Sequence, residues 1–420
     1  MLKEVILINK VQAKDFLAYA SVAQRQELLN TAEALRGKKV VHVNAVAKGG
    51  GVAELLQSVI PYMQALGIDA SWYAIDAKKA GKAFFAFTNN VHNALQGTTI
   101  DFSKEDWANY ERVNKDIAKD LDTLDYDVLV VHDPQPLAAI TFIQNKKSAV
   151  CVIHIDTSTP DTDEWKHVEK FAKQYQRILF SNLNFVNKSL PKEKLRVFPP
   201  AIDPLAYKQK IVSQKKAREY LANYGISKTG PLLVQVSRFD VWKNPHGVVE
   251  AFWLLEKKYS KAQLLLVGFQ EARDNPQAEK VYMDIRAMAG KDPRMFLFFD
   301  PRKIGGAKNI QEFTVMAQNA ADIVLQNSVK EGFGLTVTEA MWKGKPVIGG
   351  AASGIRLQIT HNKNGFIAEN TKDLAMYMDF LLSHPKEMAR LGKAAKESVR
   401  KKFLMPRFVL DHLKVYKELI

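Results

Sequence analysis

Two series of alternating strands and helices, separated by a proline-rich stretch, constrain the fold of this chain more than any other feature. In the first series, the apolar strand KKVVHVNAVA leads into a glycine loop, Lys48–Gly51, a helix that ends near Gly67 and the strand DASWYAI. A strand–loop–helix–strand unit of this kind closes with right-handed, parallel topology. The elements predicted next are a helix over 104–124, strands over 127–132 and 149–154, a helix over 163–173 and a strand over 177–181. The first half therefore predicts one doubly wound α/β domain.

The proline-rich stretch, Val197–Lys208, reads as a linker, and the alternation of strands and helices restarts after it. A chain of 420 residues is also too long for one ordinary hydrophobic core. We therefore predict an N-terminal Rossmann-like domain over 1–203 and a C-terminal one over 204–402. The leader, 1–37, is expected to be helical, and the amphipathic tail, 403–420, is expected to pack back on the first domain. Because ligands bind at the carboxyl ends of parallel strands, the expected site is a cleft between the two domains.

Composition excludes several classes of protein. The net charge is +15, but Lys and Arg are spread along the chain without a long basic block, which argues against nucleic-acid binding and suits phosphate-bearing substrates. No run approaches 18 apolar residues, and the first ten residues lack the long apolar region of a signal peptide, so we expect a cytoplasmic protein without membrane association. The single cysteine, Cys151, lies in an apolar run and is expected to be buried and unreactive.

The stretch most indicative of chemistry is Lys330–Pro346, KEGFGLTVTEAMWKGKP. A short strand precedes it, Gly332 and Gly334 predict a tight turn, and a helix is expected from about 335 to 342. The N-terminus of that helix offers unpaired N–H groups and a partial positive charge to an anion. Glu331 on the loop and Glu339 inside the helix are then placed to hold a sugar hydroxyl and a ribose diol. The alternative is a surface helix with two solvated glutamates.

Two further segments could bind phosphate. The glycine loop at Lys48–Gly51 lets the backbone approach a pyrophosphate closely, although it is not a dinucleotide fingerprint and could be a simple tight turn. Arg238 and Lys243 flank the loop SRFDVWKN, which follows a buried strand. A planar guanidinium and a compact ammonium could together clamp a diphosphate leaving group. The alternative is two exposed cations where a helix begins.

Polar side chains follow two predicted strands of the first domain. His132 begins the segment HDPQP, which contains Asp133 and Gln135, and His154 begins the segment HID, which ends at Asp156. In loops at the carboxyl edge of a sheet, these groups suit hydrogen bonds to sugar hydroxyls. The alternative is a pair of structural histidines with satisfied hydrogen bonds. Their spacing is not that of a compact metal site, so no metal ligands are predicted.

On these residues, the chain resembles the retaining nucleotide-sugar glycosyltransferases of family 4. The resemblance rests on EGFGLTVTEAMWKGKPV, the RFDVWKN loop and the first glycine loop, and it covers nearly the whole chain. It implies the GT-B architecture, an α/β fold of two doubly wound Rossmann-like domains facing across a cleft. More narrowly, the segments GGGVAELL, FFAFTNNVHNALQG, VVHDPQPLA, HIDTSTP and SRFDVWKNP resemble those of trehalose glycosyltransferring synthases and retaining trehalose phosphorylases.

The resemblance implies a role for each candidate residue. The residues with implied catalytic roles are Glu331, Arg238, Lys243 and His154. Those with implied roles in donor binding are Gly50, Gly51, Gly332, Phe333, Gly334, Leu335 and Glu339. Those with implied roles in binding an acceptor glucose are Asp133, Gln135 and Asp156. Three departures from the family pattern bear on sugar selectivity more than on fold: the Ala-Ala-Ser-Gly run at 351–354, Asn244 in place of an Asp, and the lack of a Lys after the Thr of FTNNVHN.

The expected function is transfer of glucose from ADP-, UDP- or GDP-glucose to glucose, giving trehalose with retention at the donor carbon. No cofactor is expected to be required, beyond Mg²⁺ that could accompany the nucleotide sugar. The open alternatives are a trehalose phosphorylase, a family 4 transferase with another acceptor, and a non-catalytic protein that binds a sugar nucleotide. The sequence also leaves the nucleobase and the oligomeric state open, a homodimer included.

Overall fold

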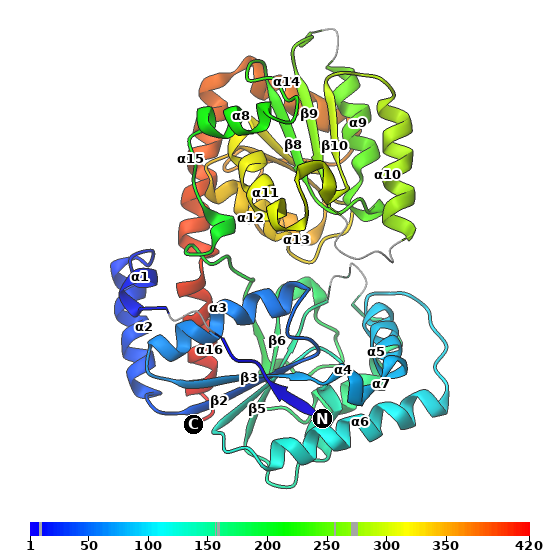
Figure 1. Ribbon diagram of the computed structural model, residues 1–420. Coiled ribbons are helices and arrows are strands. Elements are labelled where there is room, and N and C mark those ends of the chain that lie inside the picture. Colours follow the sequence, from blue (N-terminus) through cyan, green and yellow to red (C-terminus); the bar gives the residue numbers. More distant parts are fainter. Residues whose placement is uncertain (8–10, 156, 158–159, 256–257, 270–275) are drawn as a thin grey trace. The chain divides into compact units, whose positions relative to one another are not determined.

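The structure is a computed structural model that describes residues 1–420 except 8–10, 156, 158–159, 256–257 and 270–275 (Figure 1). The described chain divides into two compact units. The first unit comprises Met1–Ala201 and Leu404–Ile420, and the second comprises Ile202–Phe403. The predicted boundaries, 203/204 and 402/403, lie within two residues of these. No helix in the described part of the chain is both long and apolar enough to cross a membrane.

In the first unit, the described residues form a seven-stranded sheet in the order β1-β3-β2-β4-β5-β6-β7. The strands are β1 (Leu2–Glu4), β2 (Lys39–Asn44), β3 (Asp69–Ile75), β4 (Val128–His132), β5 (Ser148–Ile153), β6 (Arg177–Phe180) and β7 (Leu195–Val197). All neighbours pair in parallel except β1, which pairs antiparallel with β3. The prediction of a wholly helical leader is therefore wrong at 2–4, because the exposed edge of β3 captures these residues as a strand.

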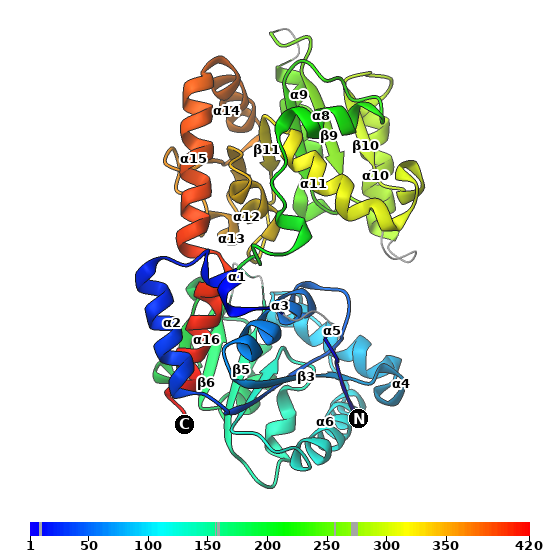
Figure 2. The ribbon, with the colours of Figure 1, turned by 60° about the vertical axis from the view of Figure 1, so that its left-hand side comes forward.

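Helices cover both faces of this sheet, as the continuous apolar strands require. On one face, Val41, Leu129 and Cys151 pack beneath α5 (Lys82–Leu95), α6 (Lys104–Asp122) and α7 (Trp165–Ala172). On the other face, Val40, Val130 and Val152 pack beneath a second group of helices. That group consists of α1 (Ala13–Leu17), α2 (Val22–Ala34), α3 (Gly51–Ala65) and α16 (Met405–Lys417), and a short helix, α4 (Ala77–Ala80), precedes α5. Figure 2 shows α16 beside α2, so the end of the chain completes this layer.

In the second unit, the described strands form a parallel six-stranded sheet in the order β10-β9-β8-β11-β12-β13. The strands are β8 (Leu232–Val236), β9 (Gln263–Val267), β10 (Met295–Phe298), β11 (Ile323–Gln326), β12 (Val347–Gly350) and β13 (Phe366–Ala368). The helices are α8 (Gln214–Ala222), α9 (Pro245–Leu254), α10 (Pro276–Ala289), α11 (Ile310–Ala320), α12 (Leu335–Trp342), α13 (Ser353–Arg356), α14 (Thr371–Ser383) and α15 (Pro385–Lys402). One face of the sheet packs against α9, α10 and α14, while α11 and α12 contact β8, β11 and β12.

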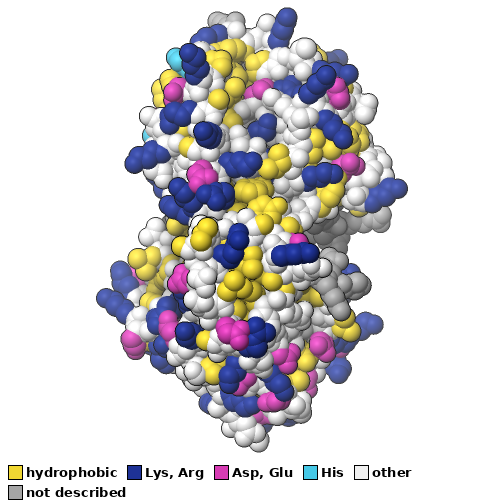
Figure 3. All heavy atoms as spheres, turned by 90° about the vertical axis from the view of Figure 1, so that its left-hand side faces the viewer, with side chains coloured by type: hydrophobic (Ala, Val, Ile, Leu, Met, Phe, Trp, Pro, Cys, Tyr) yellow, Lys and Arg dark blue, Asp and Glu magenta, His cyan; other side chains and the backbone are white. Residues whose placement is uncertain are grey.

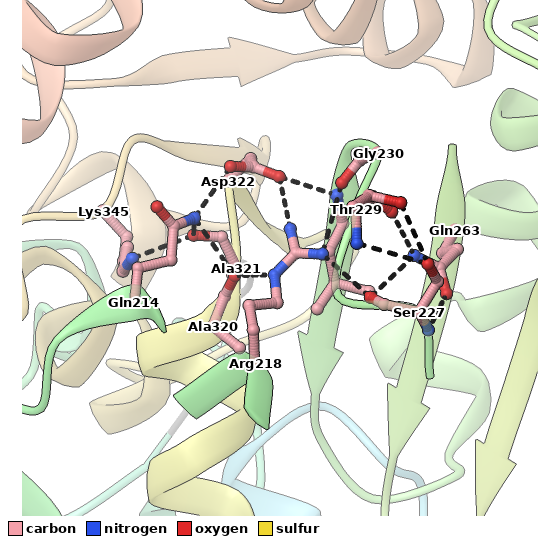
Figure 4. Close-up of polar contacts among 11 residues, drawn as sticks. Gln214, Arg218, Ser227, Thr229, Gly230, Gln263, Ala320, Ala321, Asp322 and Lys345 are labelled. Carbon is pink, nitrogen blue, oxygen red and sulfur yellow. Dashed lines mark hydrogen bonds and ion pairs between the residues drawn. The ribbon is translucent and has the colours of Figure 1, made fainter. Parts of the chain in front are cut away.

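An ion pair of a buried arginine and a partly buried aspartate joins α8 to the amino ends of β8 and β11 (Figure 4). The guanidinium of Arg218, only 8% exposed, lies 2.6 Å from Asp322 and donates a 2.8 Å hydrogen bond to the carbonyl of Ala320. The same Asp322 carboxylate accepts the N–H of Leu232, the first residue of β8. Because this cluster lies at the amino edge, it stabilises the sheet at the end opposite to the one where ligands bind in such folds.

Two predictions from composition can be checked directly. Cys151 is fully buried in β5, and burial raises the pKa of its thiol, so it is an inert core residue as predicted. Lys and Arg side chains are interspersed with Asp and Glu over the face drawn in Figure 3, without gathering into one basic block.

Candidate functional site

In the second unit, the predicted phosphate-binding loops flank the point where the strand order reverses. The chain runs from β8 outward through β9 and β10, and it then returns to place β11 on the other side of β8. The loops that follow β8 and β11 therefore lead away in opposite directions and leave a crevice between them. Arg238 and Lys243 lie on the first loop and Glu331 lies on the second. The topology thus brings together residues that are far apart in sequence.

The centre of this edge is an ion pair between Lys243 and Glu331. The Lys243 ammonium lies 2.6 Å from Oε2 of Glu331, and the two side chains are 16% and 13% exposed. The hydroxyl of Ser328 donates a longer, 3.4 Å hydrogen bond to the same oxygen. Glu339 is 5% exposed. The alternative of two solvated glutamates is therefore wrong.

Glycines let the backbone fold tightly around Glu331. Gly334, which precedes α12, has a φ of +83°, and a Cβ there would lie 3.1 Å from Cγ of Glu331. Gly354 packs against the loop so closely that a Cβ would lie 2.5 Å from the carbonyl carbon of Gly332. Its N–H donates to the Glu331 carbonyl at 3.0 Å. No side chain caps α12, so its N-terminus keeps the character of an anion site.

Glu339 lies inside α12, whereas Glu331 lies on the loop before that helix. Its Oε2 accepts a 3.4 Å hydrogen bond from the side-chain amide of Gln318 on α11. Lys343, one turn later, donates to the carbonyls of Lys208 and Glu339, and burial lowers its pKa to about 8. A buried carboxylate beside a buried amine is an expensive arrangement, so it is the kind of feature that marks functional sites.

Arg238 lies beside a hollow of about 450 Å³. The side chain is 70% exposed and lies 3.3 Å from Asp240, its partner in an ion pair. Residues around the hollow include Ser237, Arg238, Gly268, Phe269, Phe299 and Thr336. Aromatic walls, two hydroxyls and a guanidinium suit a flat heterocycle that carries an anionic group. Arg238 and Lys243 thus have different carboxylate partners. The alternative of two exposed cations is wrong for Lys243, whose side chain is largely buried, whereas Arg238 is exposed as that alternative expects.

Sequence reasoning missed three buried glutamines that hold these loops. Gln235 donates to the carbonyl of Lys243 at 3.1 Å and accepts the N–H of Asn327 at 3.3 Å, so it links the two loops. Gln326 accepts the hydroxyl of Thr336 at 3.2 Å, and Gln358 donates to the carbonyl of Phe333. The available signal was a glutamine in the apolar strands LLVQV and IVLQ, where an amide requires a partner.

In the first unit, the glycine loop and the loop after β4 also flank a point where the strand order reverses. β2 and β4 are neighbours, with β3 on the far side of β2. Gly49 and Gly50 have φ values of +78° and +86°, which favour glycine, and a Cβ at Gly50 or Gly51 would meet nothing within 4 Å. Backbone conformation therefore explains the glycines at 49 and 50, and the open space above the loop leaves room for a ligand.

Asp133 is the strained residue of this edge. Its φ is +65°, an uncommon value for a residue with a side chain, and its Oδ1 accepts the N–H of His154 at 2.7 Å. Burial raises the pKa of its carboxyl to about 6. Gln135, two residues later in the sequence, is also buried, and its Oε1 has no hydrogen-bond partner among the described residues. A buried acceptor of this kind is the atom that a ligand hydroxyl would satisfy. Asp156, the third predicted acceptor-binding residue, lies outside the described residues.

His154 and His132 are in contact, as neighbouring strand ends allow. Nδ1 of His132 lies 3.3 Å from Nε2 of His154, and the burial of His154 lowers its pKa to about 4. His132 contacts a third histidine, His42 in β2, which sequence reasoning did not single out. With contacts on both ring nitrogens, His132 fits the alternative of a structural histidine whose hydrogen bonds are satisfied. His154, just beyond the end of β5, is partly exposed. Within the described residues, no group of three or more His, Cys, Asp or Glu side chains could hold a metal ion.

Models of known protein families match both units of the chain. The family model for the trehalose synthase N-terminal domain matches residues 42–187, and the model for glycosyl transferases group 1 matches residues 216–398. The chain is 34% identical to a trehalose synthase of Pyrococcus horikoshii, over 98% of this chain and 97% of the relative. It is 36% identical to a trehalose synthase of Thermococcus litoralis, over 93% and 92% of the two chains.

More distant relatives and solved structures agree with this picture. A trehalose phosphorylase of Grifola frondosa is 26% identical over 84% of this chain and 53% of the relative. Among solved structures, apo OtsA has a TM-score of 0.71 at 14% identity, covering 91% of this chain and all of the other. The sucrose-phosphate synthase of Thermosynechococcus elongatus has a TM-score of 0.67 at 17% identity, covering 91% and 99%. At these identities the structures show the fold, which is that of GT-B glycosyltransferases.

Proposed function

Because this chain belongs to the trehalose synthase family of glycosyltransferases, we propose that it transfers glucose from a nucleoside diphosphate glucose to the anomeric hydroxyl of glucose. The product is trehalose, formed with retention at the donor carbon. A bond forms between the acceptor oxygen and the donor C1, and the bond from C1 to the phosphate oxygen breaks. The acceptor proton moves to the departing phosphate oxygen on the same face, and the nucleoside diphosphate leaves.

The observation that carries the proposal is the Lys243–Glu331 ion pair, 2.6 Å across, at the carboxyl edge between β8 and β11. A diphosphate leaving group gains negative charge as the bond to C1 breaks. Lys243, Arg238 and the uncapped N-terminus of α12 are the cationic groups that would stabilise this charge. Glu331 holds the ammonium in place before the substrate binds and would accept hydrogen bonds from the hydroxyls of the donor sugar.

The remaining donor contacts follow from the same edge. The hollow beside Arg238 would take the nucleobase, and Glu339, buried one turn after Thr336 of that hollow, would hold the ribose hydroxyls. A solved structure with the same fold, Anabaena Alr3699/HepE, is described in complex with UDP-glucose, which supports a nucleotide sugar as donor. The proposal needs no resident metal ion, and any Mg²⁺ would enter as part of the nucleotide sugar.

The first unit would supply the acceptor side. The unpartnered Oε1 of Gln135 and the Asp133 carboxylate are the described groups that we assign to glucose hydroxyls. His154, one residue beyond β5, and the open loop at Gly50 and Gly51 are the other groups at this edge that we assign to substrate binding.

The experiment offers glucose with ADP-glucose, UDP-glucose and GDP-glucose in separate reactions, and phosphate with trehalose in another. Trehalose formed from a nucleotide donor supports the proposal. Glucose 1-phosphate formed only from phosphate and trehalose would make the protein a phosphorylase, and in that case Glu339→Ala should matter little because no ribose is bound. If neither reaction runs, the acceptor assignment is wrong.

Variants test the assigned charges. Arg238→Ala and Glu331→Ala should each lower kcat/KM by about 100-fold or more, the scale of losing one preorganised contact to a developing charge. Arg302→Ala is the matched control, because Arg302 is also an exposed arginine that pairs with an aspartate two residues away, Asp300. An equal loss in Arg302→Ala would show that the effect is general and not due to the leaving group.

A further inference from the structure

Three histidines cross the sheet of the first unit in a diagonal line. His42 on β2 lies opposite Val130 on β4, and His132 is two residues further along β4. His132 in turn lies opposite Val152 on β5, and His154 is two residues beyond Val152. Because side chains alternate between faces with a period of two, all three histidines project from the same face. Diagonal neighbours of this kind are within reach of aromatic rings.

The rings meet edge to edge. Nδ1 of His42 lies 3.1 Å from Nε2 of His132, and Nδ1 of His132 lies 3.3 Å from Nε2 of His154. The ring planes are inclined by only 21° and 12°, and the ring centroids are 5.4 Å and 5.6 Å apart. That spacing is too wide for face-to-face stacking, but it fits nearly parallel rings joined through their nitrogens. Each contact is therefore an N–H···N hydrogen bond.

The line continues into the C-terminal helix. The hydroxyl of Tyr416 on α16 lies 3.3 Å from Nε2 of His42 and 3.2 Å from Nδ1 of His412. His412, Tyr416, His42 and His132 are almost completely buried, and His154 is the member nearest the carboxyl edge. We call these five residues the histidine–tyrosine chain. It links α16 to the carboxyl edge of the first unit's sheet, where the acceptor is proposed to bind.

Counting protons shows that this chain has two consistent states. Burial holds the pKa of all four imidazoles well below the usual value and raises that of the Tyr416 hydroxyl, so every member is neutral near pH 7. Each member then carries one mobile proton, and four of the five protons are used by the four hydrogen bonds. In one state all four histidines are protonated on Nδ1, and in the other all four are protonated on Nε2. Between two histidines, a mixed state would place two lone pairs or two hydrogens against each other. At Tyr416, a mixed state would either set a lone pair of a histidine against the phenol oxygen or leave the buried hydroxyl proton without an acceptor.

We propose that the histidine–tyrosine chain locks its four histidines into one common tautomer and thereby sets, from α16, whether His154 offers a donor or an acceptor to the sugar. Nδ1 of His154 is the ring nitrogen that takes no part in the hydrogen bonds of the histidine–tyrosine chain. It carries a proton in the first state and a lone pair in the second. His42, His132 and Tyr416 are then positioning residues, because they act on a ligand only through His154. The functional half of this inference rests on the proposed function, and the tautomeric half does not.

The first test is nuclear magnetic resonance of protein labelled with ¹⁵N in histidine. The sequence has nine histidines, and the ¹⁵N shifts distinguish a protonated ring nitrogen from a bare one. We expect His42, His132, His154 and His412 to show the same tautomer in the unliganded protein. Different tautomers for any neighbouring pair would overturn the proposal. This measurement needs neither substrate nor activity, so its failure is distinct from a failure to make trehalose.

The second test cuts the chain far from His154. Tyr416→Phe removes one hydroxyl and keeps the ring, so the His154 ring-nitrogen shifts should move although the substitution lies three hydrogen bonds away. Tyr175→Phe is the matched control, since the Tyr175 hydroxyl is also buried but donates to the carbonyl of Leu137, outside the chain. Unchanged His154 shifts in Tyr416→Phe, or equal shifts in the control, would refute the coupling.

Kinetic measurements test whether the histidine–tyrosine chain affects catalysis. If trehalose is formed, Tyr416→Phe should lower kcat by about two- to ten-fold, the range expected when one neutral hydrogen bond is lost, while Tyr175→Phe should leave it unchanged. A normal kcat in Tyr416→Phe despite altered His154 shifts would show that the tautomer does not matter for transfer, and would overturn the functional half.

Discussion

Mild acid should unfold the first unit because it buries neutral histidines. His42 is fully buried, and burial lowers its pKa to about 3, while the pKa values of His132 and His412 are also held well below the usual value. A group whose folded pKa lies below its unfolded pKa of about 6.5 contributes stability that is fully present above pH 6.5. That contribution is lost progressively as the pH falls toward the folded pKa.

The magnitude follows from linkage. Between pH 7 and pH 5, a histidine that titrates almost only in the unfolded chain costs about 2 kcal/mol, so these three and His154, whose pKa is lowered to about 4, together cost about 8 kcal/mol. Asp133 acts in the opposite direction: its pKa is raised to about 6, so protonation of the folded state returns about 1 kcal/mol over the same interval. The net loss is about 7 kcal/mol, which is comparable with the whole stability of a typical domain.

Urea unfolding at pH 7 and pH 5, at constant ionic strength, measures this loss. His412→Phe should reduce this loss by about 2 kcal/mol, because His412 already packs against the rings of Phe198 and Phe408 and a phenyl ring removes the titration. The variant also loses the hydrogen bond to Tyr416, but that cost is the same at both pH values and does not change the difference. His384→Phe, on the surface of the second unit, is the control substitution. Stability that is flat or rising between pH 7 and pH 5 would refute the reasoning, as would an equal effect of the two variants.

Three other expectations can be tested by unfolding measurements. Arg218→Ala should cost about 2–3 kcal/mol, because the partly buried Asp322 carboxylate then loses its cation and keeps only neutral hydrogen bonds from Leu232 and Gln214. Arg400→Ala, at an exposed pair on α15, should cost under about 1 kcal/mol, and similar costs for the two variants would contradict the assigned role of burial. Gly354→Ala should cost about 1–3 kcal/mol of stability because its Cβ would overlap the loop at Gly332, whereas Gly51→Ala, with open space around it, should be near neutral. A larger cost for Gly51→Ala than for Gly354→Ala would show that the loop at Gly332 adjusts without cost. Asp133→Asn should stabilise the protein by about 2 kcal/mol at pH 8 and not at pH 4. The raised pKa of Asp133 contributes stability below about pH 4, and this stability is lost as the pH rises through 6, so the neutral amide is an advantage only at the higher pH. Equal effects of the substitution at the two pH values would refute this sign.

Much of the fold was predictable because its signals are local. Apolar runs and helical periodicity placed α12 at 335–342, and the structure has it at Leu335–Trp342. The GT-B fold and the family were also predicted, from motifs whose glycines occupy positions that the backbone requires, as at Gly334. The roles of the individual site residues stay predictions.

Other features could not be predicted from the sequence because the residues that contact each other are distant along the chain. β1 is a strand only because the edge of β3 lies beside it, and nothing within 2–4 indicates that neighbour. The glutamines at 235, 326 and 358 are informative only once the loops that they join are known to be adjacent. His42 looked like one polar residue in an apolar strand, since its partners lie 90 and 374 residues away.

The sequence by itself determined which segments are strands and helices and where glycine and charge fall on the loops between them, because periodicity and backbone conformation depend on near neighbours. Only the tertiary structure decided the order of the strands. That order sets β8 beside β11 and β2 beside β4, and it closes the 88-residue separation between Lys243 and Glu331 to 2.6 Å. The same order aligns His42, His132 and His154 on one face. Strand order is settled by which apolar faces can be buried together, a condition on the whole domain that no short stretch of sequence contains.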